Sequence, residues 1–328
     1  MSFSPKKRLD PSRELRKRRL FFVGLAIFVV ADIALVAFAL NPPVPERATI
    51  VTAPSVTPEP SAEPVESAEP TPPVTVVDTV APTRILVARD GSLAWRATTG
   101  PCPGTPALPE LTVDAGATWK PTTATGPTGV FSLQTITIES IDVASMVGQS
   151  PVDCSPMFVR TFVAGDNYKE FPADLPGAWY VQPLDRTIIH SPSGDFAAPC
   201  ANVLAFAAHD ANRAAVLCAD QTVHLTTDAA QSWPMSALIP GAMNVAPSTR
   251  GYVIASVGAP DCAGVELLAL SEGGDEATTD VTRTGCLPTT AVPDSLAGNI
   301  ALSEAAGTLW LWAGDMLSRS GDGGATWQ

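Results

Sequence analysis

The sequence has few cationic residues after its first 20 positions. Only two lysines, Lys120 and Lys169, occur beyond residue 20. The net charge of the chain is −13 and residues 1–20 contribute +6, so the remainder carries −19. Nucleic acids and anionic lipids attract proteins through clustered lysine and arginine. This scarcity argues against both classes of partner for the main part of the chain, and we expect no nucleic-acid binding.

The spacing that marks metal sites is also missing. The six cysteines form no Cys-x-x-Cys pair, and His190, His209 and His224 are scattered along the chain. Structural zinc sites draw four such ligands from closely spaced positions. We therefore expect neither a metal site nor a cofactor.

A long apolar run is present near the start. Residues 1–20 carry eight Lys or Arg, and residues 21–40 are apolar or small except for Asp32. Twenty such residues, at a rise of ~1.5 Å each, span the ~30 Å hydrocarbon core of a membrane. Because the cationic flank stays in the cytoplasm, the sequence predicts a basic cytoplasmic tail over 1–20, a single-pass transmembrane helix over 21–40, and an exported remainder at the plasma membrane.

Two alternatives for this segment stay open. Ala37-Phe-Ala39 could serve as a cleavage site, and Arg18-Arg19 resembles part of a twin-arginine signal. The run is longer than the usual signal-peptide core of ~7–15 residues, which favours retention as an anchor. A mid-span aspartate costs ~2.5–3.5 kcal/mol, so Asp32 is either paired with a partner helix or simply tolerated.

Residues 41–73 differ sharply in composition from the anchor. They are rich in Pro, Glu, Thr, Ser, Val and Ala, as in Thr57-Pro-Glu-Pro-Ser-Ala-Glu-Pro64. Such a segment buries too little apolar surface to fold, and its prolines favour extended polyproline II. It predicts a disordered linker that separates the membrane from a domain over 74–328.

A short motif recurs within that domain. Its two full copies are Thr112-Val-Asp114-Ala-Gly116-Ala-Thr118-Trp119 and Ser320-Gly-Asp322-Gly-Gly324-Ala-Thr326-Trp327. Weaker copies retain Asp228 with Trp233, Asp166 with Phe171, and Asp275 without an aromatic residue. An Asp in a tight turn accepts hydrogen bonds from the following N–H groups, Gly supplies a positive φ, and the aromatic ring is buried between sheets. We interpret these residues as structural corners rather than catalytic groups.

These repeats resemble Asp-box motifs, and the chain resembles the Asp-box (BNR-repeat) β-propeller superfamily, which includes sialidases, xyloglucanases and photosystem II assembly factors. The motif aspartates are 52, 62, 47 and 47 residues apart. A four-stranded propeller blade occupies about 40 to 50 residues. Strand-like runs such as 203–208, 214–218 and 222–226 lie between the motifs. We expect an all-β fold, a propeller of about five four-stranded blades.

Six cysteines beyond the membrane favour three disulfides. Four of them precede a motif Asp by 10 to 13 residues and so occupy similar places on different blades, whereas Cys200 and Cys286 lie in connectors. A bridge needs Cα atoms within ~7 Å. We therefore favour Cys200–Cys218 and Cys262–Cys286 within or beside single blades, and Cys102–Cys154 follows by elimination.

The last blade is expected to lack its outer strand, because only residue 328 follows the last motif, which joins the third strand of a blade to the fourth. Residues 74–80, Val-Thr-Val-Val-Asp-Thr-Val, are rich in β-formers. We expect them to supply the missing outer strand of the last blade, so that the two ends of the domain pair and close the ring.

Two functions fit these features. One is a non-catalytic, membrane-tethered module that binds a protein or glycan at the face opposite the motif turns, where loops converge on the axis. The alternative is a sialidase-like exo-glycosidase, because Arg84-Ile85 resembles part of the family's Arg-Ile-Pro motif. Such enzymes hold a carboxylate with three arginines and use a tyrosine activated by a glutamate. The available residues are Arg84, Arg160, Arg186, Arg213, Arg250 and Arg283, with Tyr168, Tyr180 and Tyr252.

Overall fold

The computed structural model describes residues 77–272 and 279–328. The chain divides into two units, Met1–Ala68 and Glu69–Gln328, and every described residue belongs to the second. The expected basic tail, membrane helix and linker therefore lie outside the described residues. Within the described part of the chain, no helix has the length and apolar character needed to cross a membrane.

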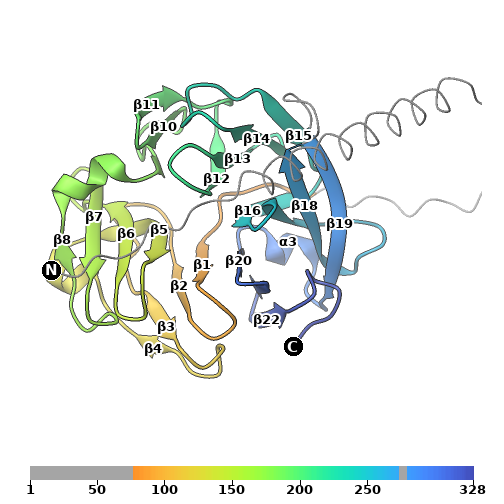
Figure 1. Cartoon of the computed structure of the whole chain (residues 1–328), viewed down its shortest axis with the longest axis horizontal. Helices are drawn as coiled ribbons and strands as arrows, with labels where there is room; N and C mark the ends of the chain where they lie inside the picture. The colour runs from red at the N-terminus through yellow and green to blue at the C-terminus, as the bar shows by residue number, and fades with distance from the viewer. Residues whose placement is uncertain (1–76, 273–278) are drawn as a thin grey trace, which may run out of the picture. The chain divides into compact units, whose positions relative to one another are not determined.

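Six antiparallel sheets, here called blades one to six, follow one another along the chain (Figure 1). Blade one comprises β1 (Arg84–Ala88), β2 (Ala94–Thr98), β3 (Glu110–Thr112) and β4 (Lys120–Pro121). Blade two comprises β5 (Phe131–Ile138), β6 (Ala144–Gln149), β7 (Pro156–Thr161) and β8 (Lys169–Glu170). Blade three comprises β9 (Tyr180–Val181), β10 (Ile188–Ser191) and β11 (Gly194–Ala197). Blade four comprises β12 (Val203–Ala208), β13 (Ala214–Cys218), β14 (Thr222–Thr226) and β15 (Met235–Leu238). Blade five comprises β16 (Ala242–Ser248), β17 (Gly251–Val257), β18 (Gly264–Glu272) and β19 (Thr279–Pro288). Blade six comprises β20 (Ile300–Ala305), β21 (Thr308–Ala313) and β22 (Met316–Ser320). Three short helical turns, α2 (Thr125–Thr128), η1 (Pro172–Gly177) and α3 (Pro293–Leu296), lie in connections between blades.

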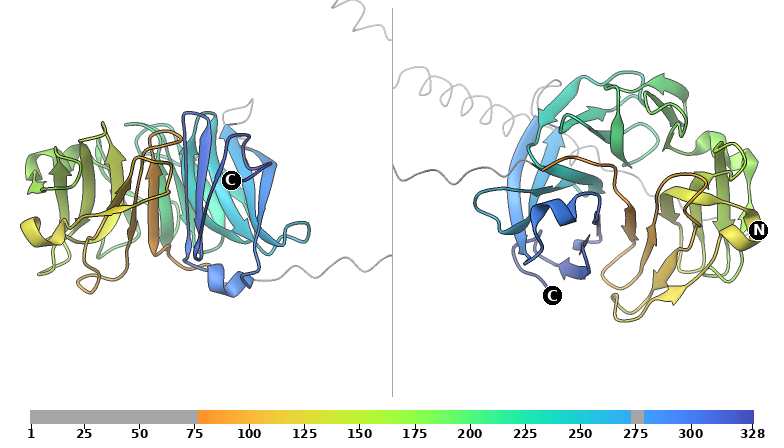
Figure 2. Two further views of the ribbon diagram at one scale, coloured as in Figure 1. Left: turned by 90° about the horizontal axis from the view of Figure 1, so that it is seen from below. Right: turned by 180° about the vertical axis from the view of Figure 1, so that it is seen from behind.

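The blades form a closed ring, which Figure 2 shows from the side and from behind. In each blade the strands run in chain order from the inside outwards. The innermost strands are β1, β5, β9, β12, β16 and β20, and each lies against those of both neighbouring blades. This is the arrangement of a β-propeller, so the expected all-β propeller fold is confirmed.

The expected number of five blades is wrong, because the ring has six. The extra one is blade three, which lies with blade four inside the 62-residue interval between Asp166 and Asp228. Its strands span only two to four residues, and the chain passes from β11 to β12 without a motif corner. Blades three and six have three strands each among the described residues, so four strands per blade is also incorrect for these two.

The ring has two distinct faces because successive antiparallel strands reverse direction. Turns between first and second strands, and between third and fourth strands, lie on one face, where Ala115 N–H donates to Ser92 C=O at 2.9 Å. We call it the corner face. The other face carries the connections that enter each inner strand, and we call it the loop face.

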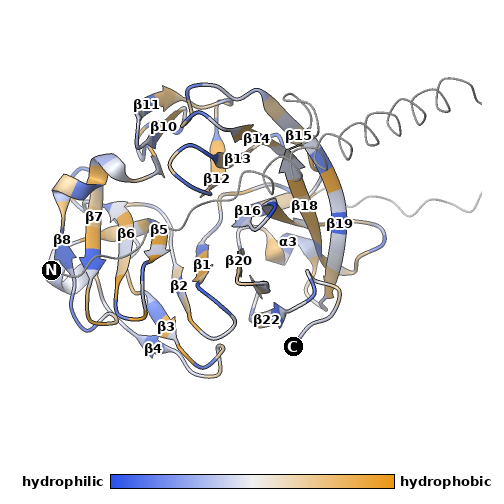
Figure 3. Ribbon diagram, in the orientation of Figure 1, coloured by the Kyte–Doolittle hydropathy of each residue, from blue (hydrophilic) through white to orange (hydrophobic). Residues whose placement is uncertain are grey.

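The hydrophobic core is divided among the six interfaces between adjacent blades. Each of the six apolar clusters among the described residues combines side chains from two neighbouring blades. Trp95 and Trp310 are the largest fully buried side chains. Hydrophobic residues accordingly follow the strands around the ring (Figure 3). The cluster between blades two and three is the smallest, with Val147, Phe158 and Tyr180 as its buried members.

The ring closes differently from the expectation. Residues 77–80 form no strand, and residues 74–76 lie outside the described part of the chain. Instead, residues 77–83 run over the loop face and contact several blades. Val77 is buried with apolar residues of blades five and six. Gln221 of blade four donates to the Thr79 hydroxyl at 2.8 Å, and Thr83 N–H donates to Gly298 C=O at 2.7 Å.

Candidate functional site

The inner strands surround a central cavity of about 1400 Å³. All six blades contribute to its wall, which reaches from Thr83 on the loop face to Arg89 on the corner face. The wall also includes the loops that carry Cys102 and Cys154 and the helical turn η1. A cavity of this size, lined by apolar groups with a few polar side chains, is the usual form of a ligand site.

Several polar residues of the cavity wall hold the blades together. The Gln134 amide of blade two donates to Val181 C=O at 2.9 Å and accepts from Val181 N–H at 3.1 Å. It thereby pairs with blade three as a neighbouring strand would. Arg186 of blade three donates to the carbonyls of Val203 and Leu204 in blade four, at 2.6 and 3.2 Å. Burial lowers the pKa of Arg186.

Asn244 provides the equivalent tie between blades five and six. Its amide donates to Ile300 C=O at 2.8 Å. Sequence reasoning did not identify Gln134, Arg186 or Asn244 in these roles. No local pattern marks a side chain that bonds to the backbone of the next blade, because the acceptor depends on the tertiary arrangement.

The arginines of the enzyme hypothesis have separate partners. The Arg84 guanidinium lies 4.3 Å from the centre of the Trp312 ring and donates to Gly314 C=O, between blades one and six. Burial lowers the pKa of Arg84. Arg160 pairs with Glu139 at 3.0 Å and with Asp174 at 3.2 Å. Together with Arg186, these guanidinium groups are held by different partners on different blades.

The remaining residues of that hypothesis are also distributed around the ring. Arg213 pairs with Asp210 at 2.7 Å, Arg283 pairs with Glu266 at 3.0 Å, and Arg250 is exposed. The Tyr168 hydroxyl lies 2.7 Å from the Thr122 hydroxyl, and burial raises the pKa of Tyr168 strongly. Tyr180 stacks on His190 with ring centres 4.4 Å apart, while Tyr252 meets the edge of His209.

The motif corners share one hydrogen-bond pattern. The Thr118 hydroxyl and N–H and the Thr112 hydroxyl all donate to Asp114, at 2.6, 2.9 and 2.8 Å. The same bonds recur at Asp228 and Asp322. These donors lower the pKa of Asp114 and of Asp322 to about 2. At Asp228 burial raises the pKa, but the bonds from Ser232 and Thr226 outweigh it and the net direction is downward.

Glycine is not essential to these corners. Gly116 has φ 84° and Gly324 has φ 98°, yet Ala230 occupies the matching place at φ 70°. At Gly324 an added Cβ would lie 2.7 Å from Leu267 of blade five. Close approach to the preceding blade therefore explains glycine there, in addition to the left-handed backbone.

The motif copy in blade two has a different register from the one expected. Thr161 accepts from the N–H groups of Val163 and Gly165, at 3.3 and 2.9 Å, as Thr112 does in blade one. Val163 therefore occupies the position in blade two that Asp114 occupies in blade one. Tyr168 likewise occupies the position of Trp119. Asp166 instead pairs with Lys120 at 2.6 Å, and Phe171 lies beyond the corner, so this assignment was three residues out. The expected copy ending at Asp275 extends outside the described residues.

The corner aromatics pack on the preceding blade. Trp233 of blade four donates to Ala197 C=O of blade three at 3.3 Å, and Trp327 of blade six donates to Cys286 C=O of blade five at 3.0 Å. Trp119 lies beside Trp312 and Leu317 of blade six. These rings seal interfaces between blades and take no part in the cavity wall.

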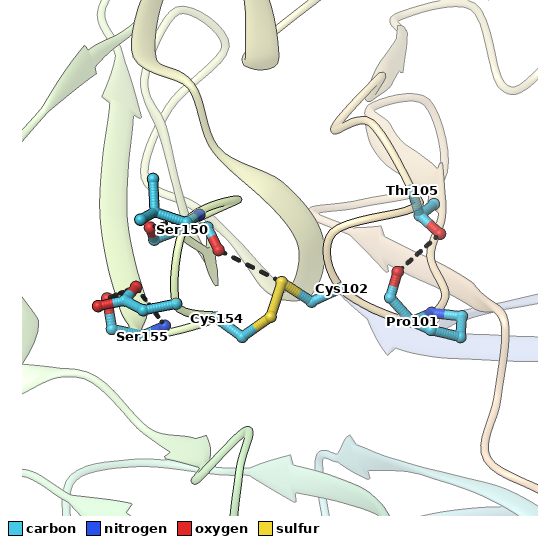
Figure 4. The surroundings of a disulfide bond; sticks show 8 residues. Pro101, Cys102, Thr105, Ser150, Cys154 and Ser155 are labelled. Carbon is cyan, nitrogen blue, oxygen red and sulfur yellow. Dashed lines mark hydrogen bonds between the residues drawn. A yellow bond between two sulfur atoms is a disulfide. The ribbon is translucent and has the colours of Figure 1, made fainter.

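The structure contains three disulfides, and the pairs are those favoured on sequence. They are Cys102–Cys154, Cys200–Cys218 and Cys262–Cys286, with Cα atoms 6.0, 6.2 and 5.8 Å apart. Cys102–Cys154 joins a loop of blade one to a loop of blade two at the cavity wall (Figure 4). In the described residues no three His, Cys, Asp or Glu side chains gather as a metal site would require.

Comparisons with known proteins assign the chain to no family. No known family description and no curated protein sequence matches the chain. Solved structures similar to it include YCF48 bound to a D1 peptide (14% identity, 77% of this chain and 82% of that chain, TM-score 0.29). Others are YCF48 from Cyanidioschyzon merolae (14%, 78% and 86%, 0.29) and the GH74 enzyme of Niastella koreensis (12%, 74% and 47%, 0.26). At these TM-scores the likenesses carry no argument about this chain.

Proposed function

We propose that the chain is a membrane-tethered, extracytoplasmic propeller that acts as a non-catalytic binding or assembly module for a protein or glycan. The observation that carries this proposal is the central cavity, whose polar wall residues Gln134, Arg186 and Asn244 are engaged in ties between blades. Such a wall offers a preformed, rigid recess. A ligand would enter from the loop face, beside the Cys102–Cys154 disulfide.

The test uses a substitution that narrows the cavity from an exposed position on its wall. Thr137 lies on inner strand β5, is exposed and lines the cavity, whereas Thr282 is exposed on the outer strand β19. Full-length protein is applied to arrays of cell-surface glycans and of overlapping synthetic peptides. We expect bound ligands to be lost with Thr137→Trp and retained with the control Thr282→Trp. Binding that survives Thr137→Trp would contradict the cavity as the site.

The alternative proposal is a sialidase-like exo-glycosidase, which rests on Arg84 and the resemblance of its neighbourhood to the family motif. A fluorogenic sialoside distinguishes the two functions. Hydrolysis that disappears with Arg84→Ala would favour the enzyme, and absence of hydrolysis by the folded protein favours the binding module.

The membrane tether is proposed from residues 1–40 alone. It places the N-terminus in the cytoplasm, the single span over 21–40 in the plasma membrane, and the propeller outside. Protease added to intact cells should then cleave the linker over 41–73 and release a fragment that contains all three disulfides. Complete protection of the domain in intact cells would reject this topology.

A further inference from the structure

The charged side chains on the wall of the central cavity are mostly arginines. They are Arg84, Arg89, Arg160 and Arg186, and among the described residues Asp174 is the one acidic side chain on this wall. The described residues as a whole have the opposite balance, with 23 Asp or Glu against 11 Lys or Arg. A recess that gathers one sign of charge attracts ligands of the other sign. The charge that remains after internal pairing therefore decides which ligands the cavity favours.

Arg160 contributes no net positive charge to the cavity. Its guanidinium pairs with Asp174 of the wall at 3.2 Å and with Glu139 at 3.0 Å. One cation here meets two carboxylates. An acidic group of a ligand is therefore not expected to bind at this part of the wall.

Arg84 and Arg89 are partly compensated. Neither forms an ion pair within the described part of the chain. Burial lowers the pKa of Arg84, and the nearby Asp315 carboxylate opposes this shift. Asp90 follows Arg89 directly in the sequence and interacts with it electrostatically. These two arginines leave only part of their charge for a ligand.

Arg186 differs from the other three, because no carboxylate among the described residues pairs with it. Its Nε–H and Nη2–H donate to the carbonyls of Val203 and Leu204, at 2.6 and 3.2 Å. Nη1 has no acceptor within the described residues and remains accessible. The adjacent Asp185 is not on the wall, and its carboxylate accepts from the Thr187 hydroxyl and N–H at 2.5 and 3.0 Å. Arg186 therefore places an uncompensated charge and an unused donor on the wall.

Apolar side chains share the wall with this arginine. Leu184, on the same turn between β9 and β10, is 80% exposed. Ile85, Val87 and Ile138 of the inner strands β1 and β5 are partly exposed and line the same cavity. Burial of such side chains against apolar groups of a ligand is favourable, whereas a sugar hydroxyl placed against them loses its hydrogen bonds to water. The wall therefore fits a peptide with apolar side chains better than it fits a glycan.

We propose that Arg186 binds a carboxylate of an acidic peptide segment, and that an apolar side chain of the same segment packs on Leu184. This rests on the proposed function, in which the central cavity is the ligand site, and it specifies the chemical class of that ligand. A charge-assisted hydrogen bond from Nη1 to the carboxylate supplies the counter-ion that the protein lacks at this position. Elsewhere the acidic surface of the domain repels such a segment, which restricts its binding to the recess.

Two substitutions test the site at different positions. Arg186→Gln removes the charge, and its amide can still donate to Val203 C=O, which preserves part of the tie between blades three and four. Leu184→Asp changes an exposed residue, so the fold is little disturbed, and it places a carboxylate where that of the ligand is expected. Leu184→Asn is its uncharged counterpart. The control is Leu238→Asp, because Leu238 is 68% exposed on the outer strand β15 and is not on the wall.

The experiment selects a phage-displayed library of random 12-residue peptides on the full-length protein. We expect enriched peptides to carry Asp or Glu near Leu, Ile or Phe. The affinity of a synthetic copy should fall about tenfold with Arg186→Gln and with Leu184→Asp, less with Leu184→Asn, and not at all with Leu238→Asp. The same peptide with its carboxylates replaced by amides should bind about tenfold more weakly, and Arg186→Gln should not weaken it further.

Thr137→Trp separates this proposal from the proposed function. Peptide binding that survives Thr137→Trp would show that the cavity is not the site, so both would fail. Where Thr137→Trp abolishes binding, the cavity is supported and two results would reject the carboxylate at Arg186 alone. They are enriched peptides without Asp or Glu, and an amide counterpart that binds as tightly as the acidic peptide. A library that yields no enriched peptide overturns the proposal, and an acidic glycan whose binding requires Arg186 would then assign the site to a glycan.

Discussion

Two interfaces of the ring have the apolar clusters with the fewest buried residues, and they are stabilised in different ways. One joins blade six to blade one, and the other joins blade two to blade three. The first is reinforced by a stack of indole and guanidinium groups, and the second depends on one side-chain amide. The comparison shows that a propeller can close firmly without a shared strand, provided that polar side chains reach the backbone of the next blade.

The interface between blades six and one contains an alternating stack. The Arg96 guanidinium lies 4.1 Å from the Trp119 ring and 5.0 Å from the Trp312 ring, and Arg84 covers Trp312 at 4.3 Å. Each such contact contributes about 0.5–1 kcal/mol or more when it is shielded from water. Because Trp119 follows a motif corner, the corner aromatic takes part directly in ring closure.

Backbone groups of blade one complete this interface. Trp310 Nε1–H donates to Asp90 C=O at 2.9 Å, and the Arg319 guanidinium donates to Gly91 C=O at 2.8 Å. The Ala88 N–H donates to the Ser303 hydroxyl at 2.9 Å. These bonds satisfy buried polar groups that would otherwise be costly.

Among the described residues, the interface between blades two and three has no stack of indole and guanidinium groups like the one between blades six and one. The inner strand of blade three has two residues, and the Gln134 amide supplies both of the bonds described above to Val181. The cluster there buries only Val147, Phe158 and Tyr180. We infer that this interface opens before the one between blades six and one.

The largest expected effect comes from Trp310→Ala. The ring is fully buried, and its loss leaves a cavity and an unpaired Asp90 carbonyl. Substitutions of this kind cost about 3–5 kcal/mol. Urea unfolding followed by circular dichroism measures the loss, and Trp310→Phe should recover part of it. Phe158→Ala at the interface between blades two and three should cost less, and an equal or larger loss there would contradict the ranking of the two interfaces.

The sequence predicted the fold class because the corners carry their own local signals. Hydroxyl, Asp and aromatic residues at fixed spacing build each turn from within, so Asp114, Asp228 and Asp322 could be found without tertiary information. Blade three has no such corner and was missed. A second signal was present, since Asp185 and Asp210 each cap the turn after an inner strand. Their separation of only 25 residues indicates one short extra blade.

The cavity wall could be predicted much less well. The blade-two corner was misplaced because Asp166 was taken as its anchor, whereas the Thr161 hydroxyl and Gly165 define the turn. The roles of Gln134 and Arg186 depend on acceptors 47 and 17 residues away. The disulfide pairs were predicted correctly from the places of the cysteines relative to the motif corners, although Cys286 lies in strand β19 rather than in the expected connector.

A second, smaller effect is expected from Gln134→Leu. The substitution keeps side-chain volume but leaves the N–H and C=O of buried Val181 unpaired. An orphaned buried polar group costs about 1–3 kcal/mol. Because blade three is small, we expect the loss to appear mainly as faster hydrogen exchange over 180–197, with a modest change in global stability.

The control for this substitution is Gln149→Leu. Gln149 also lines the cavity, and its side chain makes no interblade hydrogen bond within the described residues. Exchange in blade three should be unchanged by it. Equal acceleration in the two variants would show that cavity polarity, rather than the bond to Val181, stabilises this interface.

The smallest expected effect concerns acid and the corner of blade six. The Thr326 hydroxyl and N–H and the Ser320 hydroxyl lower the pKa of Asp322 to about 2, below its ordinary 3.8. A carboxyl whose pKa is depressed by folding stabilises the folded state above pH ~4, and that stabilisation is lost as the pH falls towards 2. After correction for intrinsic rates, hydrogen exchange over 320–328 should therefore accelerate as the pH falls from 5 to 2. The control is the connector 198–202, which has no carboxylate and whose exchange should change less. Asp322→Asn should flatten the profile of the corner. An unchanged profile in this variant would mean that other carboxylates govern acid sensitivity.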